Sequence, residues 1–349
     1  MRQIMTTILP RTIDKIIFDE MNGYYLNKSN VEVNINNSEE DNKKYLGTYF
    51  PRSFSEALTI MNDIYAQKLI RKHIIGKQQI NILDIGTGSG GNIVGMMEFF
   101  RTAGLNSETI NFHTLEGNAN AIALQKNIFD SYNQKNATKF KLSCTQIRFT
   151  SAATLNSQLV LFLKQKGLAF DFITSFKFLS EFYNIDYFQA KGIYTSFVMT
   201  LQNYIAPQGI LILFDLVSGN IDRNRPRPFT TQIMSEELND YTKSNISQLK
   251  YILPVCCGKW SDTCNRKMCY IERQFCTQHS RKANDLSKGC YRVMTETRFA
   301  NQIISSQPSE NKYQMSQNSK SPTTCFRTVI QKLLPNMNQV NILNAFTFH

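Results

Sequence analysis

The residues best suited to chemistry in this chain lie in a glycine-rich stretch that directly follows an apolar run. The stretch has the sequence Asn81-Ile82-Leu83-Asp84-Ile85-Gly86-Thr87-Gly88-Ser89-Gly90-Gly91. The apolar run is typical of a buried strand, and the apolar residues after the glycines recur at helical spacing. A strand, a turn and a helix in this order direct unpaired backbone amides at a ligand, and glycines let that ligand approach the backbone. The stretch therefore predicts a binding loop for a nucleotide-like molecule.

The spacing of the glycines fits two patterns. Gly86, Gly88 and Gly91 match the dinucleotide-binding pattern G-x-G-x-x-G. Gly86, Gly88 and Gly90, with Asp84 two residues before them, resemble the motif of the class I S-adenosylmethionine-dependent methyltransferases. The second fit is better, because a dinucleotide fold keeps an apolar residue where this chain has Asp84. The resemblance covers residues 50–300.

The resemblance implies a cofactor and the residues that bind it. The cofactor would be S-adenosylmethionine, with Asp84 facing its ammonium group. Glu116 ends the next expected strand, and a carboxylate there can accept hydrogen bonds from both ribose hydroxyls, as it could for NAD. A solvated strand end is the other interpretation of Glu116. The expected cofactor-binding residues are Asp84, Gly86, Thr87, Gly88, Gly90, Glu116 and Asn118.

The residues after the expected fourth strand, 170–176, would contact the methyl acceptor. The sequence there is Thr174-Ser175-Phe176-Lys177. It lacks the Asn/Asp-Pro-Pro-aromatic motif of amino-group methyltransferases, and no cysteine nucleophile ends the fourth or fifth expected strand as in RNA 5-methylcytosine enzymes. The sequence therefore identifies no catalytic residue, and Ser175, Phe176 and Lys177 are candidates by position alone.

A cysteine cluster near the C-terminal end of the expected sheet predicts a metal site. Six of the eight cysteines lie within residues 256–290, and four thiolates can bind zinc or hold an iron–sulfur cluster. This segment is basic and poor in apolar residues, so a metal would be needed to order it. Six reduced cysteines in a basic loop are the alternative. The expected ligands are Cys257, Cys264, Cys269 and Cys276, with Cys256, His279 and Cys290 as alternates.

A narrower resemblance is to a methyltransferase-like family associated with the mitochondrial and bacterial small ribosomal subunit. That family has an Arg-x-Pro-type segment before the glycine loop and a late cysteine cluster that binds metal. The similar residues, in the same order but with shorter spacings, are Tyr49–Ser53, Pro254, Cys256, Cys264 and Cys269–Gln274. The resemblance implies an iron–sulfur or zinc site and contact with ribosomal RNA, with or without catalysis.

Charge and hydropathy limit the kinds of partner that the protein can have. The formal net charge of the 349 residues is +12, which favours a polyanionic partner such as RNA, although the charge is spread out and a merely basic protein is the alternative. No window approaches the roughly 18 uninterrupted apolar residues of a membrane helix, so no membrane partner is expected. An intracellular protein is expected, and the short basic N-terminus leaves both the cytoplasm and the mitochondrion open.

These residues need a sheet to bring them together. The alternation of strands and helices predicts an α/β fold with a doubly wound, mostly parallel, Rossmann-like sheet. The expected parallel strands are 80–85, 111–115, 139–149, 170–176 and 209–215, with a sixth strand at 251–255. A seventh strand at 291–299 is expected to be an antiparallel edge strand.

The expected organisation around this sheet has five parts. They are an N-terminal helical extension (1–78), the cofactor-binding core (79–255), a Cys-rich insertion (256–290), the final strand (291–300) and a mostly disordered tail (301–349) with a short helix at 326–334. Within the extension, Ser53 and Glu56 form a capping box that predicts a helix over 53–73. The stretch 45–53 would then be a loop that could line a ligand cleft.

The sequence supports a methyltransferase that uses S-adenosylmethionine and acts on RNA. One alternative is a catalytically inactive, methyltransferase-like RNA-binding or ribosome-assembly factor. Another is a small-molecule methyltransferase whose N-terminal helices form a lid. The sequence predicts no particular oligomeric state.

Overall fold

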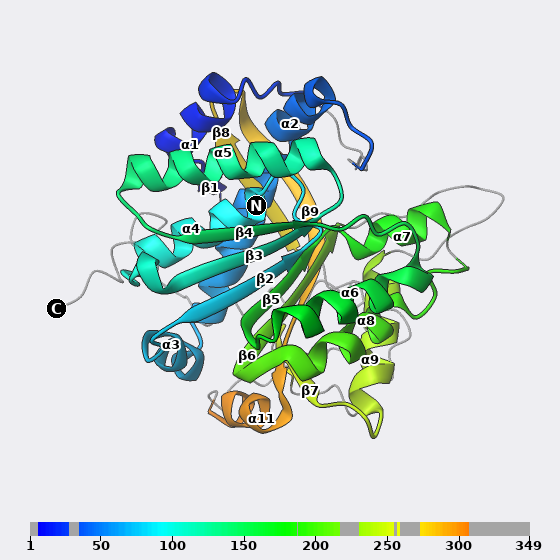
Figure 1. Cartoon of the computed structure of the whole chain (residues 1–349). Coiled ribbons are helices and arrows are strands. Elements are labelled where there is room, and N and C mark those ends of the chain that lie inside the picture. The colour runs from blue at the N-terminus through cyan, green and yellow to red at the C-terminus, as the bar shows by residue number, and fades with distance from the viewer. Residues whose placement is uncertain are drawn as a thin grey trace, which may run out of the picture.

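The computed structural model describes residues 6–27, 35–186, 188–216, 230–254, 257–258 and 273–306. Together they form a nine-stranded sheet in the order β1-β8-β9-β6-β5-β2-β3-β4, with β7 also paired to β9 (Figure 1). The parallel centre consists of β2 (Ile80–Ile85), β3 (Ile110–Glu116), β4 (Lys141–Gln146), β5 (Phe170–Phe176) and β6 (Ile205–Leu216). The remaining strands are β1 (Thr6–Ile8), β7 (Leu249–Leu253), β8 (Arg273–His279) and β9 (Lys282–Glu296).

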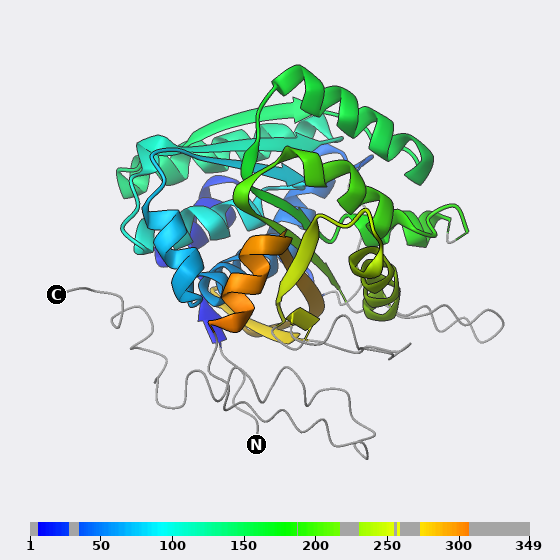
Figure 2. The same ribbon diagram turned by 90° about the horizontal axis from the view of Figure 1, so that it is seen from below.

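Helices cover both faces of the sheet, as a parallel sheet with apolar side chains on both faces requires. Every residue of β5 is buried. One face packs against α1 (Arg11–Lys15), the π-helix Ile16–Glu20, α2 (Glu39–Tyr65), α3 (Lys68–Ile75), α4 (Gly91–Thr102), α5 (Ala119–Asn136) and α11 (Thr297–Ser305). The other face packs against α6 (Ala152–Lys166), α7 (Leu179–Ile185), α8 (Ile193–Leu201) and α9 (Thr230–Lys243). Seen from below, α11 lies beside β7 and close to α3 (Figure 2).

The predicted fold class is confirmed, with two corrections at the antiparallel side of the sheet. The sheet of the described residues has nine strands instead of seven, and the antiparallel strand β9 is interior rather than an edge strand. Its first half pairs with β8, its second half pairs with β7, and its other side pairs with β6. The part of the expected Cys-rich insertion from Arg273 to Cys290 is therefore mostly sheet. It consists of β8 and the first part of β9, which pair with each other. Helix α11 extends into the expected tail as far as Ser305, and residues 307–349, with the expected helix at 326–334, lie outside the described residues.

Helix α2 corrects the predicted start of the helix over 53–73. It begins at Glu39, after the cap residue Ser38, whose Oγ accepts a hydrogen bond from the Asp41 amide at 3.1 Å. Acidic residues in the first turn add a favourable interaction with the helix dipole. The expected capping residue Ser53 lies inside this helix and donates its hydroxyl to the Tyr49 carbonyl. The expected loop at 45–53 is therefore helical.

Helices α2 and α4 cross at very short range, and glycine makes this possible. A Cβ on Gly91 would lie 2.7 Å from the carbonyl oxygen of Phe50, and a Cβ on Gly95 would lie 2.5 Å from that of Phe54. Any side chain at these positions would have to push the helices apart. The two glycines therefore fix α2 against the first helix after the glycine loop. None of the helices in the described part of the chain is both long and apolar enough to cross a bilayer.

We expect Gly95→Ala to lower the free energy of unfolding by about 1–3 kcal/mol, because the added methyl group overlaps the Phe54 backbone. Urea denaturation followed by circular dichroism measures this. Gly76→Ala is the control, since Gly76 has right-handed backbone angles and its nearest neighbour to a new Cβ is 3.4 Å away. Equal stability of the two variants would contradict the proposed role of the α2–α4 contact.

Candidate functional site

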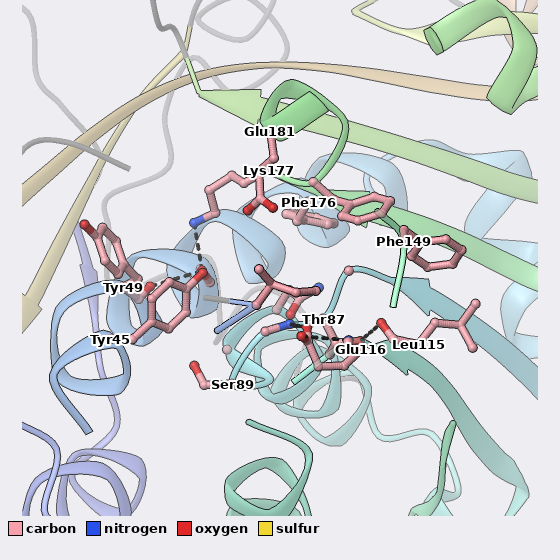
Figure 3. A pocket seen from close by; sticks show the side chains of 18 of the residues that line it. Tyr45, Tyr49, Thr87, Ser89, Leu115, Glu116, Phe149, Phe176, Lys177 and Glu181 are labelled. Carbon is pink, nitrogen blue, oxygen red and sulfur yellow. Dashed lines mark hydrogen bonds between the residues drawn. The ribbon is translucent and has the colours of Figure 1, made fainter. Parts of the chain in front are cut away.

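A pocket lies at the carboxyl ends of the central parallel strands, where the strand order turns from β3 on one side of β2 to β5 on the other. Its walls come from the glycine loop, the residues after β3, β4 and β5, and helix α2 (Figure 3). In open α/β sheets this switch point is where ligands bind. The residues around it are therefore the candidates for function.

The glycine loop has the backbone that its sequence predicts. Gly86, Gly88 and Gly90 have φ angles of 76°, 58° and 85°, which lie in the left-handed region that favours glycine. Gly86, Thr87 and Gly88 line the pocket. Gly90 is instead the N-cap residue of α4. The spacing of the glycines thus follows from the turn and from the helix start.

Glu116 ties the end of β3 to the glycine loop. One carboxylate oxygen accepts a hydrogen bond from the Gly88 amide at 2.7 Å, and the other accepts from the amides of Gly117 and Asn118, both at 2.9 Å. Burial raises the pKa of Glu116, although these three donors oppose the shift. Glu116 lines the pocket, but its present contacts hold the loop in shape. A role in binding ribose stays a prediction.

Asn118 has a structural role in the described chain. Its side-chain oxygen accepts hydrogen bonds from the amides of Asn120 and Ala121 at 2.8 and 3.1 Å, which makes it the N-cap of α5. Asparagine is among the preferred residues at this position. Asn118 is not one of the residues that line the pocket among those described. Direct contact with a cofactor therefore stays a prediction.

Asp84 lies inside the sheet, between β3 and β5, and is fully buried. Its carboxylate accepts hydrogen bonds from the Thr174 hydroxyl at 2.5 Å and from the Asn92 amide group at 2.7 Å. Burial raises its pKa to about 6. Asn92 lines the pocket, whereas Asp84 is not among the described residues that line it. The carboxylate therefore positions the start of α4 through Asn92. Its expected contact with the ammonium group of a cofactor stays a prediction.

The three candidates after β5 differ in where they point. Phe176 and Lys177 line the pocket, whereas Ser175 is buried and its hydroxyl has no hydrogen-bond partner among the described residues. Lys177 has a φ angle of 62°, which is uncommon for a residue with a side chain. This backbone conformation turns its side chain toward α2. The strained position makes Lys177 the strongest of the three candidates.

The ammonium group of Lys177 is held by helix α2. It donates to Glu56 Oε2 at 2.6 Å and to Ser53 Oγ at 2.7 Å. The other oxygen of Glu56 accepts from the Ser287 hydroxyl of β9 at 2.6 Å. Glu56 is fully buried, so Lys177 supplies the positive charge that balances it. The pocket therefore contains a lysine whose charge is already compensated.

The pocket also contains polar and aromatic residues that the sequence did not single out, among them two tyrosines and a glutamate. Tyr45 and Tyr49 lie one turn apart on α2 with ring centroids 4.8 Å apart, and both line the pocket (Figure 3). They belong to the stretch 45–53 that was expected to line a cleft. Glu181, in the first turn of α7, also lines the pocket. The sequence feature that could have pointed to Glu181 is its place just after the fourth parallel strand.

Glu181 is the pocket carboxylate that lacks a hydrogen-bond donor. No described residue donates to it, in contrast to the other carboxylates at this edge of the sheet. Burial raises the pKa of Glu181 well above the ordinary value, and the negative charges of Glu116 and Asp215 raise it further. The group is suited to interact with a cation or a donor on a ligand.

The predicted metal ligands are only partly within the described chain. Cys256, Cys264 and Cys269 lie outside the described residues. The predicted ligands inside them are Cys257, Cys276, His279 and Cys290. In the part of the chain that the structure covers, no three His, Cys, Asp or Glu side chains gather closely enough to hold a metal ion.

The sheet separates two of the described cysteines. Cys276 pairs across the strands with Leu286, and Cys290 lies four residues further along β9. At about 3.3 Å per residue this places them roughly 13 Å apart along the strand, so the two cannot share one metal ion. His279 is buried and stacks on Phe18, with ring centroids 5.5 Å apart. A zinc or iron–sulfur site stays a prediction that would depend on the cysteines outside the described residues.

Comparison with known proteins finds similarity at the level of the fold. No model of a known family and no curated protein matches the chain. A protein of Klebsiella pneumoniae described as an O-methyltransferase is 13% identical, with a TM-score of 0.36, and the match covers 82% of this chain and 90% of that one. An S-adenosylmethionine-dependent methyltransferase of Clostridium acetobutylicum is 10% identical, with a TM-score of 0.31, covering 67% of this chain and 92% of that one.

The N-methyltransferase NodS of Bradyrhizobium japonicum, in complex with S-adenosylhomocysteine, is 12% identical. Its TM-score is 0.31, and the match covers 67% of this chain and 86% of NodS. At these identities the likeness concerns the fold alone. The ligand and the activity of this chain have to be inferred from its own residues.

The buried carboxylate of Asp84 gives a prediction for the pH dependence of stability. Its pKa rises from 3.8 when unfolded to about 6 when folded, so the folded state holds the extra proton between these values. Its contribution to stability is therefore complete below the unfolded pKa and is lost as pH rises through the folded pKa. We expect wild type to lose about 3 kcal/mol relative to Asp84→Asn between about pH 4 and about pH 7. Urea denaturation of both proteins across this range measures the difference, and parallel pH profiles would contradict it.

The Lys177–Glu56 pair gives a prediction that a double-mutant cycle can test. Lys177→Met should lower the free energy of unfolding by about 3–5 kcal/mol, because it leaves the buried Glu56 without a counter-charge. Adding Glu56→Gln should restore part of that loss. Ser287→Ala serves as the control, since it removes one hydrogen bond to Glu56 but keeps the ion pair. Simple additivity of the two pair mutations in urea denaturation would show that Lys177 does not compensate Glu56.

Proposed function

We propose that this chain is an S-adenosylmethionine-dependent methyltransferase. The observation that carries the proposal is one pocket at the strand switch point that combines a glycine loop with positive φ angles and two carboxylates. Glu116 provides negative potential for a cofactor that carries a positively charged sulfur, and Glu181 adds to it when it is ionised. Aromatic residues on the same walls offer faces for a planar base or a cation. These aromatic residues are Tyr45, Tyr49, Phe149, Phe176 and Phe178.

Each part of the pocket has a proposed role in holding this cofactor. Gly86 to Gly88 allow close approach to the backbone at the start of α4, where amides face the ligand. Glu116 can accept hydrogen bonds from ribose hydroxyls while it holds the loop. Asp84 acts through Asn92, which lines the pocket. When bound, S-adenosylmethionine would supply a methyl group on a cationic sulfur, whose carbon the lone pair of an aligned acceptor would attack while the C–S bond breaks and the thioether leaves.

RNA is the acceptor that we propose first, as the net charge suggests. A protein with a formal charge of +12 attracts the phosphate backbone of nucleic acids. The pocket itself contains Glu116 and Glu181, and its lysine is already compensated by Glu56. An RNA would therefore keep its phosphates outside the pocket and insert only a base or a hydroxyl group.

A small-molecule acceptor is the second candidate, and the position of α2 favours it. Tyr45, Tyr49 and Ser53 form one wall of the pocket. Because the α2–α4 crossing holds this helix by close backbone contact, the wall is fixed instead of being a hinged lid. A fixed aromatic wall suits an acceptor small enough to enter the pocket whole.

Cofactor binding can be tested with one pair of variants. Glu116→Gln should weaken S-adenosylmethionine binding about tenfold to a hundredfold, because it replaces a charged acceptor next to the loop and sets an amide group against three backbone donors. Isothermal titration calorimetry measures the affinity. Glu108→Gln is the matched control, since Glu108 is exposed at the opposite end of β3 and pairs with Lys139.

Transfer of a labelled methyl group to fractionated RNA, protein and small molecules then separates the acceptors. Label in RNA supports the first acceptor, and label in the small-molecule fraction supports the second. Cofactor binding without transfer to any fraction would favour the inactive, RNA-binding alternative. Failure of wild type to bind S-adenosylmethionine would overturn the proposed function.

A further inference from the structure

Four acidic side chains lie near the carboxyl ends of the central strands, and three of them are supplied with hydrogen-bond donors. Asp84 accepts from a threonine hydroxyl and an asparagine amide group, and Glu116 accepts from three backbone amides. Asp215, at the end of β6, accepts from the hydroxyls of Ser180 and Tyr194, both at 2.7 Å. Such donors stabilise the ionised form of a carboxyl group.

Glu181 is the fourth acid, and it has no donor among the described residues. It lines the pocket beside Lys177 and opposite Tyr45 (Figure 3). Glu181 lies in the first turn of α7, a helix of seven residues. A carboxyl group placed in this way is free to gain or lose a proton without breaking a hydrogen bond to the protein.

The charged groups near Glu181 come from several elements around the pocket. Burial raises the pKa of Glu181, and the negative charges of Glu116 from β3 and Asp215 from β6 add to the shift. The Lys177 ammonium group is engaged by Glu56 of α2, which limits its effect on Glu181. Helix α2 also contributes the neutral phenol of Tyr45, whose pKa is raised by burial first and by Glu181 next. These surroundings therefore favour the protonated form of Glu181 when no ligand is bound.

We propose that binding of the cationic cofactor releases a proton from Glu181, whose ionised carboxylate then balances the charge of the bound ligand. This inference rests on the proposed function, because it requires S-adenosylmethionine in the pocket. With its ammonium, carboxylate and sulfonium groups, S-adenosylmethionine has one net positive charge. Placing that charge beside Glu116 and Glu181 offsets their mutual repulsion, so Glu181 can ionise. No other bond changes in this step, and the proton passes to the solvent.

Two consequences separate this mechanism from simple binding. Affinity for S-adenosylmethionine rises with pH, by up to about tenfold per pH unit for one released proton, between the pKa values of Glu181 in the bound and free proteins. S-adenosylhomocysteine has the same outline but no sulfonium charge. It should therefore release a smaller fraction of a proton, even if it binds with similar affinity.

The experiment is isothermal titration calorimetry of the full chain with each ligand, in two buffers that differ in ionisation enthalpy. The dependence of the binding heat on the buffer gives the number of protons released. Measurements stay below about pH 7.5, where the amino group of either ligand remains largely protonated. For wild type we expect release of a substantial fraction of one proton with S-adenosylmethionine and clearly less with S-adenosylhomocysteine.

The variants assign the proton. Glu181→Gln should abolish the release and flatten the pH dependence of affinity, whereas Glu181→Asp should retain part of both. Asp215→Asn tests another buried carboxyl group whose pKa is raised, and release should persist in it. Thermal denaturation checks that each variant is folded.

Equal proton release in wild type and Glu181→Gln, or equal release with the two ligands, would overturn the inference while leaving the proposed function intact. No binding of either ligand to wild type would overturn both.

Discussion

The tie between Glu116 and the glycine loop is the constraint on which the rest of the site depends. Three backbone amides from two different turns converge on one buried carboxylate. An unpaired amide buried at this edge of the sheet would be costly, so the carboxylate fixes both turns relative to each other. The pocket at the switch point therefore has a defined shape before any ligand binds.

The same edge of the sheet concentrates negative charge, and the protein balances it residue by residue. Asp84 and Asp215 each have a pKa of about 6 because burial outweighs their hydrogen bonds. Glu56 is balanced by Lys177, which reaches it from a left-handed backbone position after β5. Among the acids at this edge in the described part of the chain, Glu181 is the one without a hydrogen-bond donor, and we propose that a cationic cofactor interacts with it.

The antiparallel strand β9 connects the sheet to the wall of the pocket. Ser287 donates to Glu56, and Asp285 accepts hydrogen bonds from Arg52, at 2.7 Å from Nη2 and at 2.9 Å from Nε. Both partners lie on α2, so the helix is held by the sheet extension as well as by α4. An arginine and an aspartate that are both buried need each other, since either one alone would be an uncompensated charge.

The sequence by itself determined the doubly wound sheet, the glycine turn and the position of Glu116, because strand periodicity and backbone demands for glycine are local properties. It also indicated that residues 45–53 border the ligand site. Tertiary structure alone decided that Ser53 lies inside a helix, that β9 is interior, and that Cys276 and Cys290 are far apart. It also decided which acids receive hydrogen-bond donors and which one faces the pocket without a donor among the described residues. Those outcomes depend on contacts between residues distant in the chain, and no local pattern records which donor a buried carboxylate will meet.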